Sequence, residues 1–440
     1  MPVLGDRLTR LRDALRLDDP RVVFGALLLL LLAVTYLAPA ALVDRSDEPG
    51  YLGYAERLTH GRYAVHDGSP FDFLWRGPGL PLLLAPFVWL DAPIELMRLT
   101  GPVLLLATAY LLYRMLIPRF GPGWALAGAA ALGLYFPIWR LLPRIFSEPL
   151  ALLLLVGSMT LFGIAVRERT GPGRVVLAGL LLGGTVLVRV EYGYVATGLL
   201  LVSLIWWAVR RASPVAGRSV LLSAVALVAC VPWLVYTHHE TGKAPYWSSS
   251  GGLSLYWMAT GFSEDLGEPH VEKEVQDNPD LAKNRPFFAT LPSDPVARDE
   301  ALREEASDNI KDDPLRYARN LAANFSREWT HWPYSYGQAT GKLMFYAIPG
   351  LALFVALVTS LVVVARRRWF YVEYVPFALF ALGAMALHTL AAGYPRSIWP
   401  LLPVILVVLL TAVQAWHGKN GGAPSPNRVV RHEPAGEILD

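Results

Sequence analysis

Three acidic side chains, Asp44, Asp47 and Glu48, follow the first long apolar segment of the chain. A carboxylate at such a position can act as a general base that takes a proton from a hydroxyl nucleophile. The same residues also fit the start of a helix, with Asp47 as the N-cap and Glu48 in the favourable first turn. Both interpretations are open from the residues alone.

Three more charged residues stand where apolar segments begin or end, namely Arg76, Glu148 and Arg396. Arg76 could simply be an interfacial anchor whose head group reaches water. Glu148 comes shortly after Arg144 and precedes a long apolar run. It is therefore either a neighbour of a helix start or a functional carboxylate that holds an acceptor or orients a base. Each of these residues has a structural and a chemical interpretation.

The composition places these residues in a membrane protein. Of the 440 residues, 54% are hydrophobic and only 17% are charged, and the mean hydropathy is +0.38. Soluble chains carry about a quarter charged residues. The net charge of +3 does not indicate a nucleic-acid partner. The single cysteine, Cys230, can form neither an intrachain disulfide nor a cysteine-based metal site.

Ten apolar segments are long enough, or nearly so, to cross a bilayer. They cover residues 22–43, 97–117, 123–142, 147–166, 174–188, 192–209, 219–237, 342–365, 371–391 and 397–416. The first is too long for the core of a signal peptide, so we interpret it as a spanning helix. A further segment, 77–90, is short and contains three prolines, which predicts an interfacial or re-entrant piece.

The basic residues indicate the orientation of these segments. Arginine clusters at 114–119, 167–174, 210–218 and 366–368 all fall on the N-terminal side if 77–90 does not cross. The positive-inside rule then places both termini in the cytoplasm and the acidic segment 238–341 outside. Within that segment, helical apolar spacing up to residue 330 predicts an amphipathic helix at the headgroup level.

The chain is accordingly divided into five parts. These are a cytoplasmic N-terminus (1–21), an N-terminal transmembrane module (22–237) with a candidate catalytic outer loop (44–91), an extracytoplasmic loop domain (238–341), C-terminal transmembrane helices (342–416) and a disordered cytoplasmic tail (417–440). The two outer segments are where the charged candidates would meet.

The first outer loop resembles that of GT-C fold glycosyltransferases, the superfamily of the protein O-mannosyltransferases and the lipid A aminoarabinose transferase. The matching pattern is D-E-x-x-Y followed by A-x-x-L-x-x-G-x-Y, here Asp47, Glu48, Tyr51, Ala55, Leu58, Gly61 and Tyr63. Further pieces that resemble motifs of this family follow in order at 73–80, 143–150, 183–191, 246–253 and 393–403. One departure is Gly77-Pro78-Gly79, which stands where the family has two prolines.

The resemblance implies a role for each candidate. Asp47 would be the catalytic base. The remaining site residues are Glu48 and Glu148 as catalytic carboxylates, and Arg76, Arg396, Tyr51 and Arg144 as contacts to the substrate or to the phosphate of its lipid carrier. The pair Arg189 and Glu191 is interpreted as scaffold.

The predicted fold is an all-α polytopic membrane protein, GT-C-like, with about ten transmembrane helices, interfacial helices in the first outer loop and a small outer-face domain. The predicted function is transfer of a sugar, with inversion, from a polyprenyl-phosphate donor to an envelope acceptor at the outer face of a bacterial inner membrane. A lipid carrier is expected because the cytoplasmic side has no nucleotide-binding Gly-rich loop. No metal-ligand spacing is present, no cofactor is predicted with certainty, and a divalent cation is left open.

Two alternatives belong to other classes. A lipid-linked glycan ligase or polymerase also uses polyprenyl carriers, but we expect its key residues in a later loop. A membrane transporter would carry ionisable groups within its spanning helices and two halves of similar pattern. The sequence has neither feature, and His388 is the nearest case. The sequence identifies neither the sugar nor the acceptor.

Overall fold

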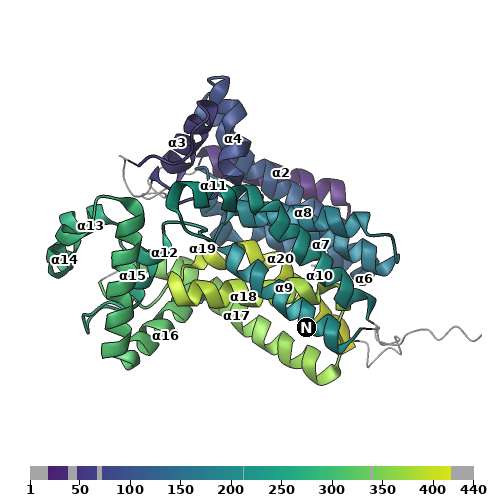
Figure 1. Cartoon of the computed structure of the whole chain (residues 1–440). Coiled ribbons are helices and arrows are strands. Elements are labelled where there is room, and N and C mark those ends of the chain that lie inside the picture. The colour runs from purple at the N-terminus through teal and green to yellow at the C-terminus, as the bar shows by residue number, and fades with distance from the viewer. Residues whose placement is uncertain (1–17, 38–46, 67–71, 212, 337–339, 418–440) are drawn as a thin grey trace, which may run out of the picture.

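The computed structural model describes residues 18–37, 47–66, 72–211, 213–336 and 340–417. These residues form helices and connecting loops, with no strand among them. Asp44, most of the N-terminal segment 1–21 and nearly all of the tail 417–440 lie outside the described residues. In Figure 1 the described chain divides into a large helical bundle, a helix pair that projects from it, and a group of short helices at one end.

The bundle contains the long apolar helices. They are α2 (Pro20–Leu37), α6 (Thr100–Leu134), α7 (Glu148–Arg167), α8 (Gly173–Val188), α9 (Tyr192–Val209), α10 (Pro214–Ala229), α11 (Val231–Thr241), α17 (Thr340–Arg367), α18 (Val375–Ala391) and α20 (Leu402–His417). By length and composition, 7 helices of the described chain can cross a membrane, or 8 if α10 and α11, bent by 42°, form one span. The all-α polytopic class is confirmed.

This count is lower than the ten crossings expected, for two reasons. First, α6 contains two of the expected segments, which are joined at Gly121, a residue with φ of 76°. Leu116 lies 3.1 Å from where a β-carbon of Gly128 would stand, although a straight helix would separate these residues by about 18 Å. The chain therefore reverses at Gly121. Second, α8 has only 16 residues, which is short for a bilayer.

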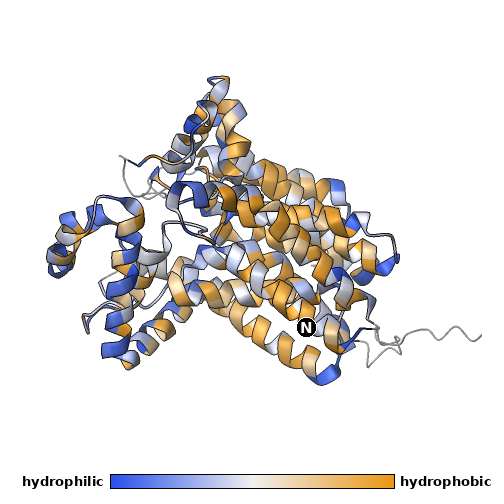
Figure 2. Ribbon diagram, in the orientation of Figure 1, coloured by the Kyte–Doolittle hydropathy of each residue, from blue (hydrophilic) through white to orange (hydrophobic). Residues whose placement is uncertain are grey.

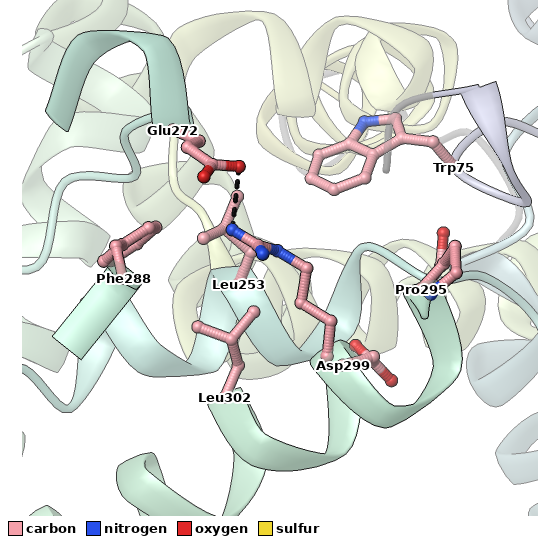
Figure 3. Close-up of a pocket in the computed structure, with 9 residues that line it drawn as sticks. Trp75, Leu253, Glu272, Phe288, Pro295, Asp299 and Leu302 are labelled. Atoms are coloured by element: carbon pink, nitrogen blue, oxygen red, sulfur yellow. Dashed lines mark hydrogen bonds and ion pairs between the residues drawn. The ribbon is translucent and has the colours of Figure 1, made fainter. Parts of the chain in front are cut away.

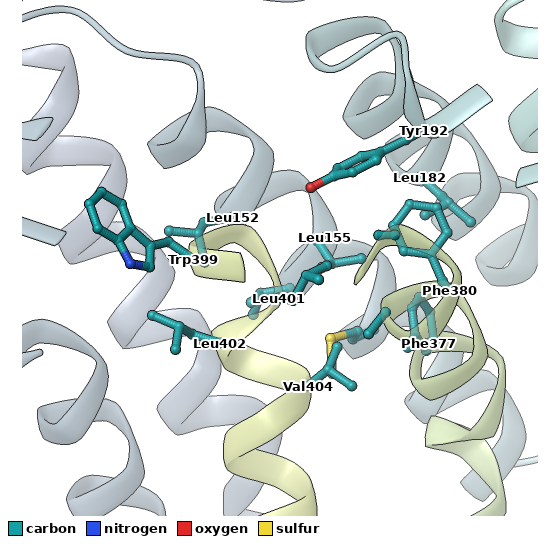
Figure 4. Close-up of a cluster of buried hydrophobic side chains, with 14 of the residues drawn as sticks. Leu152, Leu155, Leu182, Tyr192, Phe377, Phe380, Trp399, Leu401, Leu402 and Val404 are labelled. Atoms are coloured by element: carbon teal, nitrogen blue, oxygen red, sulfur yellow. The ribbon is translucent and has the colours of Figure 1, made fainter. Parts of the chain in front are cut away.

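Small residues hold α8 in the bundle. Gly179 and Gly183 lie one turn apart on the face towards α10, and a β-carbon on Gly183 would stand 2.7 Å from the carbonyl oxygen of Ala226. Such close contact is typical of helices that pack in a membrane, where dispersion forces replace the hydrophobic effect. Further into the bundle, side chains of α7, α9, α18 and α20 form the core in Figure 4, including Leu155, Phe377 and Val404.

The first outer loop forms a helix pair. It consists of α3 (Glu48–Thr59) and α4 (Gly79–Trp89), and the short α5 (Ile94–Arg98) leads from it into α6. These are the two helices that project from the bundle in Figure 1. With 11 residues, α4 is only about 16 Å long, so it is too short to span, as its prolines indicated.

The segment 238–341, which is expected outside, forms a group of helices that we call the outer group. It contains α12 (Gly251–Met258), α13 (Glu272–Asp277), α14 (Arg285–Thr290), α15 (Pro295–Asp312) and α16 (Pro314–Thr330), and the short α19 (Pro395–Ile398) lies where it meets the bundle. Short 3-10 helices complete the described chain at Phe136–Leu141, Pro279–Asn284, Val372–Tyr374 and Trp399–Leu401. In Figure 2 the outer group is largely hydrophilic and the bundle hydrophobic.

The helix α16 buries its polar side. The expected amphipathic helix is broken in two before Pro314, because proline cannot donate the next helical hydrogen bond. On α16 the side chains of Asn320, Asn324, Arg327 and Glu328 are fully buried, whereas Leu315 and Phe325 are exposed. Since Phe325 also contacts Phe354 of α17, with ring centroids 5.8 Å apart, the exposed apolar side continues onto a spanning helix. This arrangement fits a helix that lies on the headgroup layer.

Candidate active site

Helix starts position three of the expected site residues. Glu48 and Glu148 are the first residues of α3 and α7, and each is followed by a proline. Arg396 is the second residue of α19, directly after Pro395. Proline is favoured in the first turn of a helix because its fixed φ suits the helix and its missing N–H is not needed there. The sequence therefore sets where each helix begins, and with it where each charge stands.

Arg76 is held by its backbone. The hydroxyl of Tyr63 donates to the Arg76 carbonyl at 2.8 Å, and the hydroxyl of Tyr54 accepts from the N–H of Trp75 at 3.0 Å. On the other side, the Ser248 hydroxyl and the Ser249 N–H donate to the carbonyls of Trp75 and Leu74. The Tyr of the G-x-Y motif and the serine-rich segment thus fix the same loop from two sides.

The Gly-Pro-Gly departure from the family pattern has a steric reason. A β-carbon on Gly77 would stand 2.2 Å from the carbonyl oxygen of Leu187, and one on Gly79 would stand 2.8 Å from the backbone nitrogen of Val188. The loop after Arg76 lies directly on the end of α8, so only glycine fits at these two positions. Glycine at both positions therefore suits the geometry of this loop.

Asp47 joins the two expected phosphate-binding arginines. Its Oδ1 accepts from Nη2 of Arg76 at 3.0 Å, and its Oδ2 accepts from Nη1 of Arg396 at 2.7 Å. Asp47 stands at the N-cap position of α3 with Glu48 in the first turn, as expected, but its side chain makes no helix-capping hydrogen bond. The structure brings together Asp47, Arg76 and Arg396 although they come from three different segments.

The ionic network continues through Glu148. Its Oε1 lies 4.0 Å from Nε of Arg396 and accepts from Nη1 of Arg189 at 3.1 Å, while its Oε2 is buried without a hydrogen-bond partner. Arg189 also pairs with Glu191 at 2.9 Å. We call Asp47, Arg76, Arg396, Glu148, Arg189 and Glu191 the ionic network. Its three carboxylates alternate with its three guanidinium groups, so its formal charges balance.

The environment of Asp47 keeps this carboxyl ionised. Burial alone would raise its pKa, but the charges of Arg396 and Arg76, and the hydrogen bonds from them, outweigh burial and hold the pKa well below its usual range. The same balance lowers the pKa of Glu191 to about 2, through burial opposed by Arg189. Without a ligand, Asp47 is therefore a counter-ion and a weak base.

Tyr51 lies under Arg76. The guanidinium carbon of Arg76 stands 5.1 Å from the centre of the Tyr51 ring, within the range of a cation–π contact. Burial, reinforced by the charge of Asp47, raises the pKa of Tyr51 to about 12. The ring therefore stays neutral and supports the guanidinium group of Arg76.

Glu48 and Arg144 form a separate cluster. Glu48 accepts two hydrogen bonds from Arg98, at 2.7 and 2.9 Å, one from Arg144 at 3.2 Å and one from the Ile145 N–H at 3.0 Å. Burial would raise its pKa, but the bonds from Arg98 lower it. The structure thus turns Glu48 away from Asp47 and joins it to the loop before α7.

Two residues of these clusters were not assigned a functional role from the sequence. Arg98 lies in no motif, but it begins the spanning segment 97–117 at the end expected outside, and an arginine there departs from the positive-inside rule, which is a usable signal. Arg189 was noted but interpreted as scaffold. Its bonds to Glu148 and Glu191 place it in the ionic network.

A cavity in the outer group reaches the same loop. It is lined by Trp75, Ser249, Leu253, Glu272, Phe288, Pro295, Arg298, Asp299 and Leu302. Figure 3 shows the Trp75 ring on one side and Glu272 on the other. Glu272 forms an ion pair with Arg298, 2.7 Å long. Trp75 therefore ties the outer group to the loop that carries Arg76. Across the described residues, no cluster of three His, Cys, Asp or Glu side chains is arranged to hold a metal ion.

Comparisons with known proteins give weak likenesses to membrane glycosyltransferases. No protein-family model and no curated protein matches the chain. Among solved structures, the chain is similar to ArnT from Cupriavidus metallidurans bound to undecaprenyl phosphate, with 16% identity and a TM-score of 0.39 over 90% of this chain and 77% of that one.

It is also similar to an oligosaccharyltransferase from Archaeoglobus fulgidus tethered with an acceptor peptide, with 14% identity and a TM-score of 0.49 over 91% of this chain and 50% of that one. AglB of the same archaeon, in complex with an inhibitory peptide and a dolichol-phosphate, aligns at 13% identity with a TM-score of 0.43. This chain spans about half the length of the archaeal proteins. At these identities and TM-scores the likeness carries no argument about chemistry.

Proposed function

We propose that this protein is a GT-C membrane glycosyltransferase that takes a sugar from a polyprenyl-phosphate donor, with the ionic network as its active site. The observation that carries the proposal is the meeting of Arg76 and Arg396 on the single carboxylate of Asp47. Two guanidinium groups that converge from separate loops suit a phosphate, which accepts several charge-assisted hydrogen bonds at once.

The position of the network suits a lipid carrier. Glu148 and Arg396 stand at the ends of apolar helices, so a phosphate bound there would stay near water while a prenyl chain stays among lipid tails. Arg119 and Arg167, two of the arginines expected inside, both lie near Glu373 at the far end of α18. By the positive-inside rule we propose that the network faces outward, across the inner membrane of a bacterium, towards an envelope acceptor.

The phosphate and Asp47 would compete for the same two cations. Because the charges of the network already balance, a phosphate can bind only if Asp47 gives up contacts to Arg76, Arg396 or both. The released carboxylate then loses the charges that lower its pKa and becomes a stronger base. Donor binding would in this way prepare Asp47 for its role.

The proposed reaction is one direct displacement. The acceptor oxygen bonds to C1 of the sugar while the bond from C1 to the phosphate oxygen breaks, and the polyprenyl phosphate leaves with that electron pair. The proton of the acceptor hydroxyl passes to Asp47. A single displacement inverts the configuration at C1. The buried Oε2 of Glu148, which has no partner, would accept a hydrogen bond from the acceptor and orient it.

The contacts of Glu48 and Arg144 support a positioning role within this proposal. Glu48 receives four hydrogen bonds, which is about the full capacity of a carboxylate. By tying the start of α3 to the loop before α7, it would hold Asp47 at its place next to Glu148. Its own contribution to the proton transfer would be small.

The test is binding of undecaprenyl phosphate to purified variants. Arg76→Ala and Arg396→Ala should each weaken binding by about tenfold or more, since a hydrogen bond to a charged group contributes about 1.5–3 kcal/mol. Arg396→Lys should be milder because a point charge still pairs with phosphate. The matched control is Arg62→Ala, an exposed arginine of the same loop. Unchanged binding in both alanine variants would refute the site.

A further inference from the structure

The buried polar side of α16 holds the end of α18. The Nδ2 of Asn324 donates to the carbonyl oxygens of His388 and Thr389, at 3.1 and 2.8 Å. These carbonyls belong to the last turn of α18. The carbonyl of His388 also accepts from the Ala392 N–H at 2.8 Å, whereas the N–H that would reach Thr389 in a continued helix, that of Gly393, donates to Asn324 instead. Asn324 thus caps a spanning helix from the side of the outer group. The side chain is fully buried, so water cannot replace it.

The same side chain also holds the loop that leads to Arg396. Its Oδ1 accepts from the N–H of Gly393 at 2.8 Å and from Nη2 of Arg327 at 2.9 Å. A β-carbon on Gly393 would stand 2.4 Å from the backbone oxygen of Asn324, so the loop lies directly against α16. Arg396 follows within one turn of helix, in α19.

We infer that Asn324 is a positioning residue for Arg396, through which the outer group sets the place of a cation that binds the donor phosphate. The inference rests on the function proposed above and extends it to a residue far from the network in sequence. The side-chain amide of Asn324 makes four hydrogen bonds. Two go to the end of α18, one comes from Gly393 and one from Arg327. Movement of α16 would therefore be transmitted to the loop before Arg396.

Asn320 provides a matched control one turn earlier on α16. It is also fully buried, its Oδ1 accepts from Arg319, and its Nδ2 donates to a backbone carbonyl, that of Met258 at 3.1 Å. Met258 belongs to α12 of the outer group. Both asparagines are buried, accept from an arginine and donate to a backbone carbonyl, but only Asn324 contacts the segment that carries Arg396.

The experiment compares Asn324→Asp with Asn320→Asp in the full-length protein. In each variant the side-chain NH₂ group, which donates to a backbone carbonyl, becomes a carboxylate oxygen that cannot donate. In each case a neighbouring arginine can pair with the new negative charge. Both variants should lower the melting temperature. Only Asn324→Asp should weaken binding of undecaprenyl phosphate, by about fivefold, in the range of measured couplings between neighbouring residues.

A double variant separates positioning from general damage. In an Arg396→Ala background, Asn324→Asp should weaken binding no further, because the cation that it positions is absent. Gly393→Ala, which must push the loop away from Asn324, should reproduce the effect and serves if Asn324→Asp does not fold. Equal effects of the two asparagine variants, or an additive effect on Arg396→Ala, would overturn the inference alone. Normal binding by Arg396→Ala itself would overturn the proposed function as well.

Discussion

Asp47→Asn removes the charge that holds Arg76 and Arg396 together while keeping the size of the side chain. If the phosphate competes with Asp47 for these cations, the variant should bind undecaprenyl phosphate more tightly than the native protein. Each contact of Asp47 is to a charged group, at 3.0 and 2.7 Å, and such contacts contribute about 1.5–3 kcal/mol. Because the site is partly open to water, we take about 1.4 kcal/mol, a tenfold gain in affinity.

Transfer should change in the opposite direction. An asparagine cannot accept the proton of the acceptor, so turnover of lipid-linked sugar should fall by about 100-fold or more. Binding is measured by titration of the purified protein in detergent, and turnover by release of polyprenyl phosphate in membrane vesicles. The control is Asp72→Asn, a carboxylate of the same loop that pairs with Arg57 and should change neither quantity. Weaker or equal binding would refute the competition, and full turnover would refute the base.

Two further predictions concern pH. The pKa of Asp47 is held low in the free protein by Arg396 and Arg76 against the effect of burial, and activity is lost as pH falls through it. Donor binding should raise that pKa. The acid limb of kcat, which reports the complex, should therefore lie at higher pH than the acid limb of kcat/KM, which reports the free enzyme. Coinciding limbs would contradict the competition between the phosphate and Asp47. Burial raises the pKa of Glu328 from 4.5 to about 8, so the folded protein keeps a proton that the unfolded chain loses. Between pH 4.5 and about 8 the free energy of unfolding should therefore fall by up to about 1.4 kcal/mol per pH unit. In thermal unfolding, Glu328→Gln should flatten this slope. An unchanged slope in the variant would assign the pH dependence to other groups.

The chemistry-bearing residues of the outer loops could be found from the sequence because charge is rare in such a chain. Arg76, Glu148 and Arg396 stood out at the ends of apolar runs, and the family pattern suggested that they meet Asp47. The short helix α4 was also predictable, since its prolines and length are local properties. The all-α class followed from composition and the length of the apolar segments alone.

Other features depend on contacts that no local pattern contains. Asp47 takes the N-cap position that the sequence predicted, but its oxygens accept from two arginines that are distant in sequence and not from the backbone of α3. The partner of Glu48 could not be identified, since Arg98 is distant in sequence. The helical spacing of α16 was recognised, but the burial of its polar side depends on carbonyls of α18 and on Arg327. The chain reverses at Gly121 through a positive φ. A glycine allows this conformation, but its presence in the sequence does not predict it.

The helix α16 buries its polar side and exposes apolar residues, which has a consequence for bilayers of different thickness. A spanning helix adapts to a thicker or thinner membrane by tilting, which would move the outer end of α18 and α20 relative to the surface. A helix that lies on the headgroups keeps its depth instead. Because Asn324 of α16 holds Gly393 in the loop before Arg396, this depth would be passed on to Arg396. The reaction plane would then stay level with the phosphates of the surrounding lipids while the bundle beneath it tilts.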